Sequence, residues 1–402
     1  MSIGDSLGKF TYRGPISSSK SLYNRALVVQ SFFPDIKLNA YSECDDVKNM
    51  IAATKSLHEN LHNSAEINCG EAGTVLRFMA FRASREKGVF RLRGKSRLFQ
   101  RPQKELLVIL NQLSVEAKLL PNELIIKSKS WQRPLIPLQI NRERTSQFST
   151  GILMSAWNLD FPLEFKLHPM DMHDTYWNMS LDFVRQLGME VILKGKDHYL
   201  IPAGQTCFVR ELAVEPDYSS AMAVATIAAI AGEAHLLNVG NSSLQPDYAF
   251  IKILKNMGIL ISLEKDILHI QRVAKVSPVN VSVQETPDLF PVLAILCAFA
   301  EGESRLTGAP RLALKESNRI TKTSELLQLI GVKNNILEDG IIIHGKGEVL
   351  KPRAFEFDPD QDHRMAMAAG ILIRAGWPIK LKTPEVVKKS FPEFWQILGI
   401  KT

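Results

Sequence analysis

Residues 217–230 read DYSSAMAVATIAAI, a small polar cluster followed at once by a run of alanine and other apolar residues. A run at helical spacing that is apolar nearly all round is typical of a helix buried on every side. The polar cluster is typical of a helix start, where a serine often serves as the N-cap. The segment therefore predicts a buried helix with a polar N-terminus.

The same pattern occurs five more times, at intervals of roughly 70 residues, although no identical segment recurs. The other copies are SSSKSLYNRALVV from Ser17, GEAGTVLRFMA from Gly70, RTSQFSTGILMSA from Arg144, TPDLFPVLAILCAFA from Thr286 and QDHRMAMAAGILI from Gln361. Six occurrences favour a repeat-built α/β protein over six coincidences. A length of 402 residues is also too great for one ordinary core.

A second, amphipathic helix pattern follows each buried one. These segments are DDVKNMIAATKSL from Asp45, RPQKELLVILNQL from Arg101, TYWNMSLDFVRQLGM from Thr175, DYAFIKILKNMGI from Asp247, RITKTSELLQLIGV from Arg319 and EFWQILGI from Glu393. Short alternating stretches between them, such as 122–130, 191–203 and 258–272, indicate strands and hairpins. The simplest interpretation is six similar units, each with two helices and a few strands, with three units in each of two domains.

Composition narrows the class of protein. Apolar residues make up 45% and charged residues 23%, with no apolar run long enough to span a bilayer. The first residues lack signal-peptide or transit-peptide character, so we expect a cytoplasmic protein. Four scattered cysteines without a CxxC pair favour buried free thiols over a metal site or disulfides. A net charge of +7 suits nucleic acid or small polyanionic substrates, but basic and aromatic residues are not interleaved.

The helix starts are the first candidates for function, because free N–H groups and the helix dipole attract anions there. Basic, polar and acidic residues gather at these starts. The acidic ones are Asp45, Asp46, Asp288, Glu316 and Asp362. Each residue taken singly also has an ordinary interpretation. A lysine or arginine near a helix start can be a solvated surface residue, and a Ser-Ser pair can be a plain N-cap.

Taken together, ten short motifs resemble the EPSP synthase family, from Gly14 to about Trp395 and in the family's order. They are SKSLYNRAL (19–27), GEAGTVLR (70–77), RP (101–102), SQF (146–148), PDYSSA (216–221), QPD (245–247), PDLFP (287–291), LKESNR (314–319), DHRMAM (362–367) and KSFPEF (389–394). The resemblance implies a two-domain, inverse α/β barrel-like fold of six βαβαββ repeats, three per domain. It implies domains at 18–216 and at 1–17 with 217–402, and an active site in the cleft between them.

The implied reaction joins the enolpyruvyl group of phosphoenolpyruvate to the 5-hydroxyl of shikimate 3-phosphate and releases phosphate, in the shikimate pathway to chorismate and the aromatic amino acids. The resemblance implies catalytic roles for Lys20, Asp288 and Glu316. Phosphoenolpyruvate would be bound by Lys20, Gly73, Arg101, Gln147, Arg319, Arg364 and Lys389. Shikimate 3-phosphate would be bound by Ser21, Arg25, Thr145, Ser146, Gln147, Tyr176, Asp288 and Lys315. Arginine suits such ligands because its planar fork binds carboxylate or phosphate through two parallel bonds.

Neither a cofactor nor a metal is expected, and the partners would be the two substrates alone, bound by a monomer without nucleic acid or membrane. Asp288 also fits a helix N-cap and Glu316 a surface carboxylate, while His363 fits a ligand-side donor and a packed helix-start residue equally. Departures from the family's pattern are Ser18-Ser19, Glu71, Phe78, His173 and Arg311. Glu71 adds negative charge near an anion, and with Phe78 it favours reduced glyphosate sensitivity.

Three other functions remain open. One is enolpyruvyl transfer to UDP-N-acetylglucosamine, although those enzymes usually carry a reactive cysteine in the loop that here contains Arg101. Another is transfer to a relative of shikimate 3-phosphate, which the changes at His173 and Arg311 would accommodate. The third is a non-catalytic anion- or RNA-binding protein, which would have no need of the acids Asp288 and Glu316.

Overall fold

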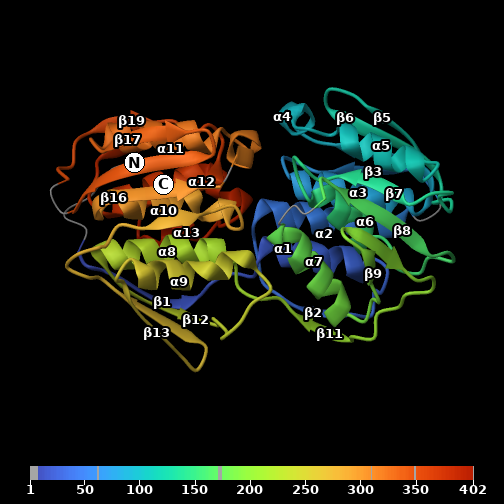
Figure 1. Ribbon diagram of the computed structural model, residues 1–402, viewed down its shortest axis with the longest axis horizontal. Helices are drawn as coiled ribbons and strands as arrows, with labels where there is room; N and C mark the ends of the chain where they lie inside the picture. Colours follow the sequence, from blue (N-terminus) through green and yellow to red (C-terminus); the bar gives the residue numbers. More distant parts are fainter. Residues whose placement is uncertain (1–7, 61–62, 171–173, 309, 348–349, 402) are drawn as a thin grey trace. The chain divides into compact units, whose positions relative to one another are not determined.

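The computed structural model describes residues 8–60, 63–170, 174–308, 310–347 and 350–401. The chain divides into two units (Figure 1). We call Lys20–Val214 the N-terminal unit, and Met1–Ser19 with Glu215–Thr402 the C-terminal unit. Each is described by itself below.

Four sheets share one strand order. In the N-terminal unit they are β3 (Ala65–Asn68), β4 (Lys87–Arg93), β6 (Glu123–Lys129) and β5 (Glu116–Leu119), then β7 (Leu138–Asn141), β8 (Leu163–His168), β10 (His198–Ile201) and β9 (Ile192–Gly195). In the C-terminal unit they are β1 (Phe10–Pro15), β12 (Gly232–Leu237), β14 (Ile267–Gln271) and β13 (Leu260–Glu264), then β15 (Asn280–Ser282), β16 (Glu301–Thr307), β18 (Gly340–Lys346) and β17 (Lys333–Leu337). The first two strands of each sheet pair in parallel and the rest antiparallel. A parallel pair followed by a returning hairpin is the sheet of a βαβαββ unit.

Two further sheets are shorter. Strands β2 (Lys37–Asn39) and β11 (Glu211–Ala213) pair in parallel in the N-terminal unit, as do β19 (Phe355–Phe357) and β20 (Ile379–Leu381) in the C-terminal unit. Among the described residues, these two sheets therefore keep the parallel pair of the repeat and lack its hairpin. The predicted α/β fold of repeated units is confirmed, with four units complete and two reduced.

The apolar segments of the sequence form the inner helices. They are α1 (Lys20–Gln30), α3 (Gly73–Ser84) and α6 (Gln147–Met154) in the N-terminal unit, and α8 (Tyr218–Ala231), α10 (Phe290–Ala298) and α12 (His363–Arg374) in the C-terminal unit. Within each unit, the three inner helices pack against one another. Figure 1 shows α8, α10 and α12 grouped within their unit. Every residue of α10 and α12 is buried, as the absence of a polar face predicts.

The amphipathic segments form helices that bury one face. They are α2 (Asp45–Glu59), α5 (Lys104–Gln112), α7 (Thr175–Gln186), α9 (Phe250–Asn256), α11 (Arg319–Leu329) and α13 (Phe394–Ile397). A short helix α4 (Ser96–Gln100) was not predicted, since five residues carry too little periodicity to recognise. None of the helices in the described ranges has the length and apolar character needed to span a bilayer.

Local chemistry fixes where the inner helices of the C-terminal unit begin. The Asp217 carboxylate accepts from the Ser220 backbone N–H at 2.8 Å, which caps α8. The Asp362 carboxylate likewise accepts from the Arg364 N–H at 2.9 Å and caps α12. At the other end of α8, a side chain at Gly232 would overlap the Phe10 backbone, so glycine permits the close approach of β1 and β12.

The two stretches of chain at the predicted domain crossings pair with each other. Ser18 and Pro216 form an isolated antiparallel bridge. The Ser19 N–H donates to the Glu215 carbonyl at 2.8 Å, and the Asp217 N–H donates to the Ser17 carbonyl at 2.9 Å. This pairing joins the N-terminal strand segment to the start of α8, so the serines at 18–19 lie in an ordered, bonded segment.

Candidate active site

In the N-terminal unit, Lys20 forms an ion pair at the start of α1. Its Nζ lies 3.0 Å from Oδ2 of Asp46, in the first turn of α2. Both side chains are largely buried, with exposed fractions of 14% and 8%. A largely buried carboxylate that faces the amine at this distance restricts the position of the amine. Asp46 is thus a partner of the expected catalytic lysine that the motif comparison did not assign.

Arg77 lies in α3, and its side chain contacts residues at the starts of α5 and α6. It is buried, its Nη1 donates to Gln147 Oε1 at 2.6 Å, and its Nε donates to Gln103 Oε1 at 3.2 Å. The Gln147 amide in turn donates to Thr74 Oγ1 at 2.9 Å. The expected ligand residue Gln147 is therefore held at both ends of its amide group. Phe148 lies under the Arg77 guanidinium at 5.3 Å and supports it by a cation–π contact.

Gly73 begins α3 beside a second guanidinium. A Cβ at this position would lie 3.0 Å from Arg101 Nη1 and 3.4 Å from Arg77 Nη1. The lack of a side chain therefore lets both guanidinium groups approach the N-terminus of α3. Free helix N–H groups together with two guanidinium groups form a site suited to an anion.

The N-terminal unit's residues expected to bind shikimate 3-phosphate lie at or near the starts of α1, α6 and α7. Arg25 is buried, with 4% exposed; its Nε and Nη2 donate to Ser180 Oγ at 3.0 and 2.9 Å, and its Nη1 donates to the Ser21 carbonyl. Burial lowers the pKa of Arg25 to about 10, while nearby Tyr176 and Asp174 oppose that shift. Arg25 therefore contacts Ser21 and the α7 residue Ser180 from a buried position.

Thr145 and Ser146 lie just before α6. Thr145 Oγ1 accepts from the Gln147 backbone N–H at 3.2 Å, and Ser146 is buried with its carbonyl accepting from Ser149. Tyr176 lies in the first turn of α7, where its carbonyl accepts from Ser180 Oγ at 2.7 Å. The described contacts connect Tyr176 through Ser180 to Arg25.

In the C-terminal unit, Arg319 is the centre of a buried charge cluster. Its side chain is 1% exposed and contacts three carboxylates, those of Asp288, Glu316 and Asp362. The respective distances are 2.8, 3.4 and 2.9 Å. Burial alone lowers the pKa of Arg319, but the three carboxylates outweigh it and raise the pKa. The arginine is thus a fixed cation that holds both expected acid/base carboxylates.

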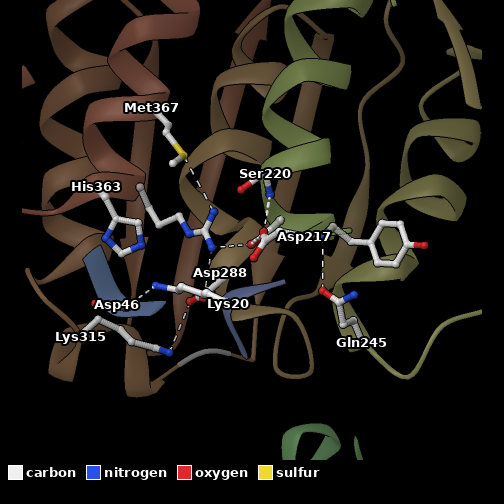
Figure 2. Close-up of polar contacts among 12 residues, drawn as sticks. Lys20, Asp46, Asp217, Ser220, Gln245, Asp288, Lys315, His363 and Met367 are labelled. Carbon is white, nitrogen blue, oxygen red and sulfur yellow. Dashed lines mark hydrogen bonds and ion pairs between the residues drawn. The ribbon is translucent and has the colours of Figure 1, made fainter. Parts of the chain in front are cut away.

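Asp288 also faces two other cations. Besides Arg319, Lys315 Nζ lies 3.5 Å from its Oδ1 and Arg364 Nη2 lies 3.6 Å from its Oδ2. Figure 2 shows Lys315 directed at Asp288. Asp288 lies in the 3₁₀ turn η2 (Pro287–Leu289) that leads into α10, and it is 21% exposed. It is therefore an accessible carboxylate whose negative charge is stabilised by its neighbours.

Two further residues of this unit lie at the start of α12, and Lys389 lies at the end of a 3₁₀ turn. Asp362 is excluded from solvent, caps α12 and accepts from Ser317 Oγ at 3.0 Å. His363 is also buried, with Nδ1 3.8 Å from Asp362. Lys389 is buried at the end of the 3₁₀ turn η5 (Pro384–Lys389). The burial of His363 favours its interpretation as a packed helix-start residue.

Two departures from the family's pattern have partners in the structure. Glu71 forms an ion pair with Lys95 at 2.7 Å, so the extra negative charge expected from Glu71 has a cation beside it. Phe78 is buried and lies 5.5 Å from the Arg25 guanidinium, where it supports that group. Arg311 lies in the 3₁₀ turn η3 (Pro310–Leu314), and His173 lies outside the described residues.

The structure brings some of the expected residues together within each unit. Gly73, Arg101 and Gln147 lie around Arg77 in the N-terminal unit, where Lys20 pairs with Asp46. Asp288, Lys315, Glu316, Arg319 and Arg364 lie together in the C-terminal unit. The sequence did not predict the pairings of the expected site residues with Asp46, Asp362, Ser180 and Ser219, although Asp46, Asp362 and Ser219 lie in the helix-start segments that it singled out. Across the described residues, no three His, Cys, Asp or Glu side chains are grouped to hold a metal ion. Cations around paired carboxylates are suited to proton transfer on anionic substrates.

Known structures with the same fold define the class of protein. The chain is similar to an EPSP synthase from Acinetobacter baumannii, with a TM-score of 0.76 and 22% identity over 98% of this chain and 96% of that one. It is also similar to the enolpyruvyl transferase NikO from Streptomyces tendae, with a TM-score of 0.71 and 14% identity over 98% and 95% of the two chains. The fold is thus that of the enolpyruvyl transferases.

Sequence comparison narrows the class to a family. The family model of EPSP synthase (3-phosphoshikimate 1-carboxyvinyltransferase) matches residues 36–398. A 3-phosphoshikimate 1-carboxyvinyltransferase of Syntrophobacter fumaroxidans is 33% identical over 83% of this chain and 79% of its own length. One of Vibrio vulnificus is 27% identical over 96% of this chain and 95% of its own length. The chain belongs to the EPSP synthase family, and the expected family and enzyme class are confirmed.

Proposed function

We propose that this chain transfers the enolpyruvyl group of phosphoenolpyruvate to the 5-hydroxyl of shikimate 3-phosphate. This is the activity for which its relatives are named, and it serves the shikimate pathway to aromatic amino acids. The observation that carries the proposal is that Asp288 and Glu316 share one buried guanidinium, that of Arg319, at 2.8 and 3.4 Å. Two carboxylates fixed on one cation, and bordered by Lys315 and Arg364, suit a reaction that needs proton transfers to and from anionic substrates.

The first step joins the two substrates. The oxygen of the 5-hydroxyl bonds to carbon 2 of phosphoenolpyruvate, and its proton passes to Asp288. The methylene carbon of phosphoenolpyruvate gains a proton at the same time, from Lys20 or Glu316. Asp288 suits the role of acceptor because it is 21% exposed, whereas Asp362 is excluded from solvent.

The second step breaks the bond between carbon 2 and the phosphate oxygen, and phosphate leaves. The methyl group then returns a proton, for which Glu316 is the proposed acceptor, and the carbon–carbon double bond is restored. Glu316 is held within 3.4 Å of Arg319 Nη2, so its carboxylate keeps one orientation through both transfers.

Binding is divided between the units in this proposal. Arg101, Gln147 and the N-terminus of α3 at Gly73 would hold phosphoenolpyruvate from the N-terminal unit, and Arg319, Arg364 and Lys389 from the C-terminal unit. Ser21, Arg25, Thr145, Ser146 and Tyr176 would hold shikimate 3-phosphate together with Lys315. The proposal requires both sets to act on the same substrates, with residues 18–216 and the rest of the chain as the two domains. A monomeric, cytoplasmic enzyme that binds neither nucleic acid nor membrane is part of the proposal.

The test is phosphate release from phosphoenolpyruvate with shikimate 3-phosphate, and separately with UDP-N-acetylglucosamine, as acceptor. We expect release only with shikimate 3-phosphate, and a loss of roughly 100-fold or more in kcat for Glu316→Gln. Glu356→Gln is the matched control, because Glu356 is a carboxylate of the same unit paired with exposed lysines. Release with UDP-N-acetylglucosamine alone, or with neither acceptor, would refute the proposed substrate. An unaffected Glu316→Gln would refute the assigned role.

A further inference from the structure

The Arg364 guanidinium has one firm hydrogen-bond anchor in the C-terminal unit. Its Nη2 donates to Ser219 Oγ, in the first turn of α8, while its Nη1 lies 3.9 Å from Met367 Sδ, a weak acceptor. Its Nε is buried and makes no hydrogen bond to any described residue. The side chain is only 1% exposed. The orientation of the guanidinium therefore depends on Ser219.

The direction of each hydrogen bond in this group follows from its chemistry. A guanidinium only donates, so the Ser219 hydroxyl must accept from Arg364. The hydroxyl gives its own proton to Asp217 Oδ1, at 2.7 Å. The same oxygen of Asp217 accepts from the Ser220 backbone N–H at 2.8 Å as the N-cap of α8 (Figure 2). A fixed helix start thus orients the serine, and the serine orients the arginine.

We propose that Ser219 is a positioning residue for phosphoenolpyruvate binding, which it serves by fixing the plane of the Arg364 guanidinium. This inference rests on the proposed function, in which Arg364 binds phosphoenolpyruvate. A carboxylate or phosphate binds an arginine through two parallel bonds only when the guanidinium plane is set in advance. With Ser219 in place, Nη2 stays 3.6 Å from Asp288 Oδ2. Without it, the guanidinium is free to turn onto that carboxylate and away from the substrate.

Ser220 offers a matched control on the same turn. Both serines are buried, at 7% and 0% exposed. The Ser220 hydroxyl makes no hydrogen bond to a described residue. The contribution of Ser220 to the cap of α8 comes from its backbone N–H, which alanine retains. Ser219→Ala and Ser220→Ala therefore each remove one buried hydroxyl next to the same cap, but only the first removes a contact with Arg364.

The experiment measures kcat and the KM for each substrate in Ser219→Ala, Ser220→Ala, Arg364→Gln and the double variant Ser219→Ala with Arg364→Gln. Loss of a hydrogen bond to a charged group predicts a rise of roughly tenfold in the KM for phosphoenolpyruvate in Ser219→Ala. The KM for shikimate 3-phosphate stays within about twofold, and Ser220→Ala resembles the wild type. In the Arg364→Gln background, Ser219→Ala adds no further rise, because both changes remove the same interaction.

The outcomes separate this inference from the proposed function. If Arg364→Gln leaves the KM for phosphoenolpyruvate unchanged, the assignment of Arg364 to that substrate is wrong, and the role of Ser219 fails with it. If Arg364→Gln raises this KM but Ser219→Ala behaves like Ser220→Ala, only the positioning role is refuted. A Ser219→Ala effect of equal size in both backgrounds, or equal rises in both KM values with a lowered Tm, would indicate a structural role and would also refute it.

Discussion

Arg319 and Asp362 form an ion pair that water does not reach. Nε of the arginine lies 2.9 Å from Oδ2 of the aspartate, and the two side chains are 1% and 0% exposed. Asp362 also caps α12, so the pair ties the start of α11 to the start of α12. The expected ligand residue Arg319 is therefore held in place by a carboxylate that takes no part in the proposed chemistry.

We expect Asp362→Asn to lower the free energy of unfolding by about 3 kcal/mol, because a buried guanidinium loses part of its compensating charge. Asparagine still fits as an N-cap, so the loss reports on the charge and not on the cap. Urea unfolding measures the change. Glu356→Gln, whose partner Lys380 is 78% exposed, should change stability little. If the two variants lowered the free energy of unfolding equally, the burial of the Arg319–Asp362 pair would not explain its effect on stability.

Glu71 and Lys95 should act as a compensating pair close in sequence to Gly73, a residue proposed to bind phosphoenolpyruvate. Lys95→Ala leaves the Glu71 carboxylate without the cation that now lies 2.7 Å away, so we expect the KM for phosphoenolpyruvate to rise by roughly twofold at low salt. Added salt should diminish the effect, and Glu71→Gln combined with Lys95→Ala should abolish it. Lys194→Ala, which breaks a similar 2.8 Å pair with Glu164, is the control. A salt-independent rise would argue against electrostatics.

The sequence predicted the inner helices because their apolar runs are local and leave no polar face. It missed α4, which has five residues, and the reduction of two sheets to parallel pairs, because strands of three residues give no alternation to recognise. Motifs identified Arg25 and Arg364, but their partners Ser180 and Ser219 lie 155 and 145 residues away in the chain. Such pairings depend on tertiary packing, which no local spacing encodes.

Cysteine reactivity should differ among the four thiols. Burial raises the pKa of Cys44 to about 11 and that of Cys297 to about 12, and it raises the pKa of Cys69 further. Cys207 is only half-buried, which departs from the expectation of four buried thiols. Because the thiolate is the reactive form, we expect iodoacetamide at pH 8 to modify Cys207 first. Mass spectrometry of the wild type and Cys207→Ser checks this, and a fast-reacting thiol that persists in the variant would refute it.

The stacked histidines on β12 and β14 predict a loss of stability in mild acid. The rings of His235 and His269 lie 4.1 Å apart, centroid to centroid. Burial, then His269 and Arg13, lower the pKa of His235, while Glu233 opposes the shift. The unfolded chain therefore binds the proton more readily, so stability is highest above the ordinary pKa of about 6.5 and falls as pH drops below it.

The measurement is the urea midpoint at pH 8 and pH 5.5 for the wild type and for His235→Gln. We expect the variant to lose a smaller part of its stability between these two pH values, since the group that prefers the unfolded state as a cation is gone. His344→Gln, on a different sheet, should keep the pH dependence of the wild type. An equal dependence in the wild type and His235→Gln would show that other groups cause it.

Gly73 should be intolerant of a side chain for reasons of binding and not of folding. An alanine Cβ would lie 3.0 Å from Arg101 Nη1, which is closer than ordinary contact, and the guanidinium would have to move away from the N-terminus of α3. Alanine inside a helix is otherwise at least as favourable as glycine, so the Tm of Gly73→Ala should equal or exceed that of the wild type. We expect the KM for phosphoenolpyruvate to rise roughly tenfold, as for a lost charge-assisted bond. Gly195→Ala is the control, because a Cβ there meets nothing within 4 Å. An unchanged KM in Gly73→Ala would show that Arg101 can move without cost, and would remove this glycine from the proposed site.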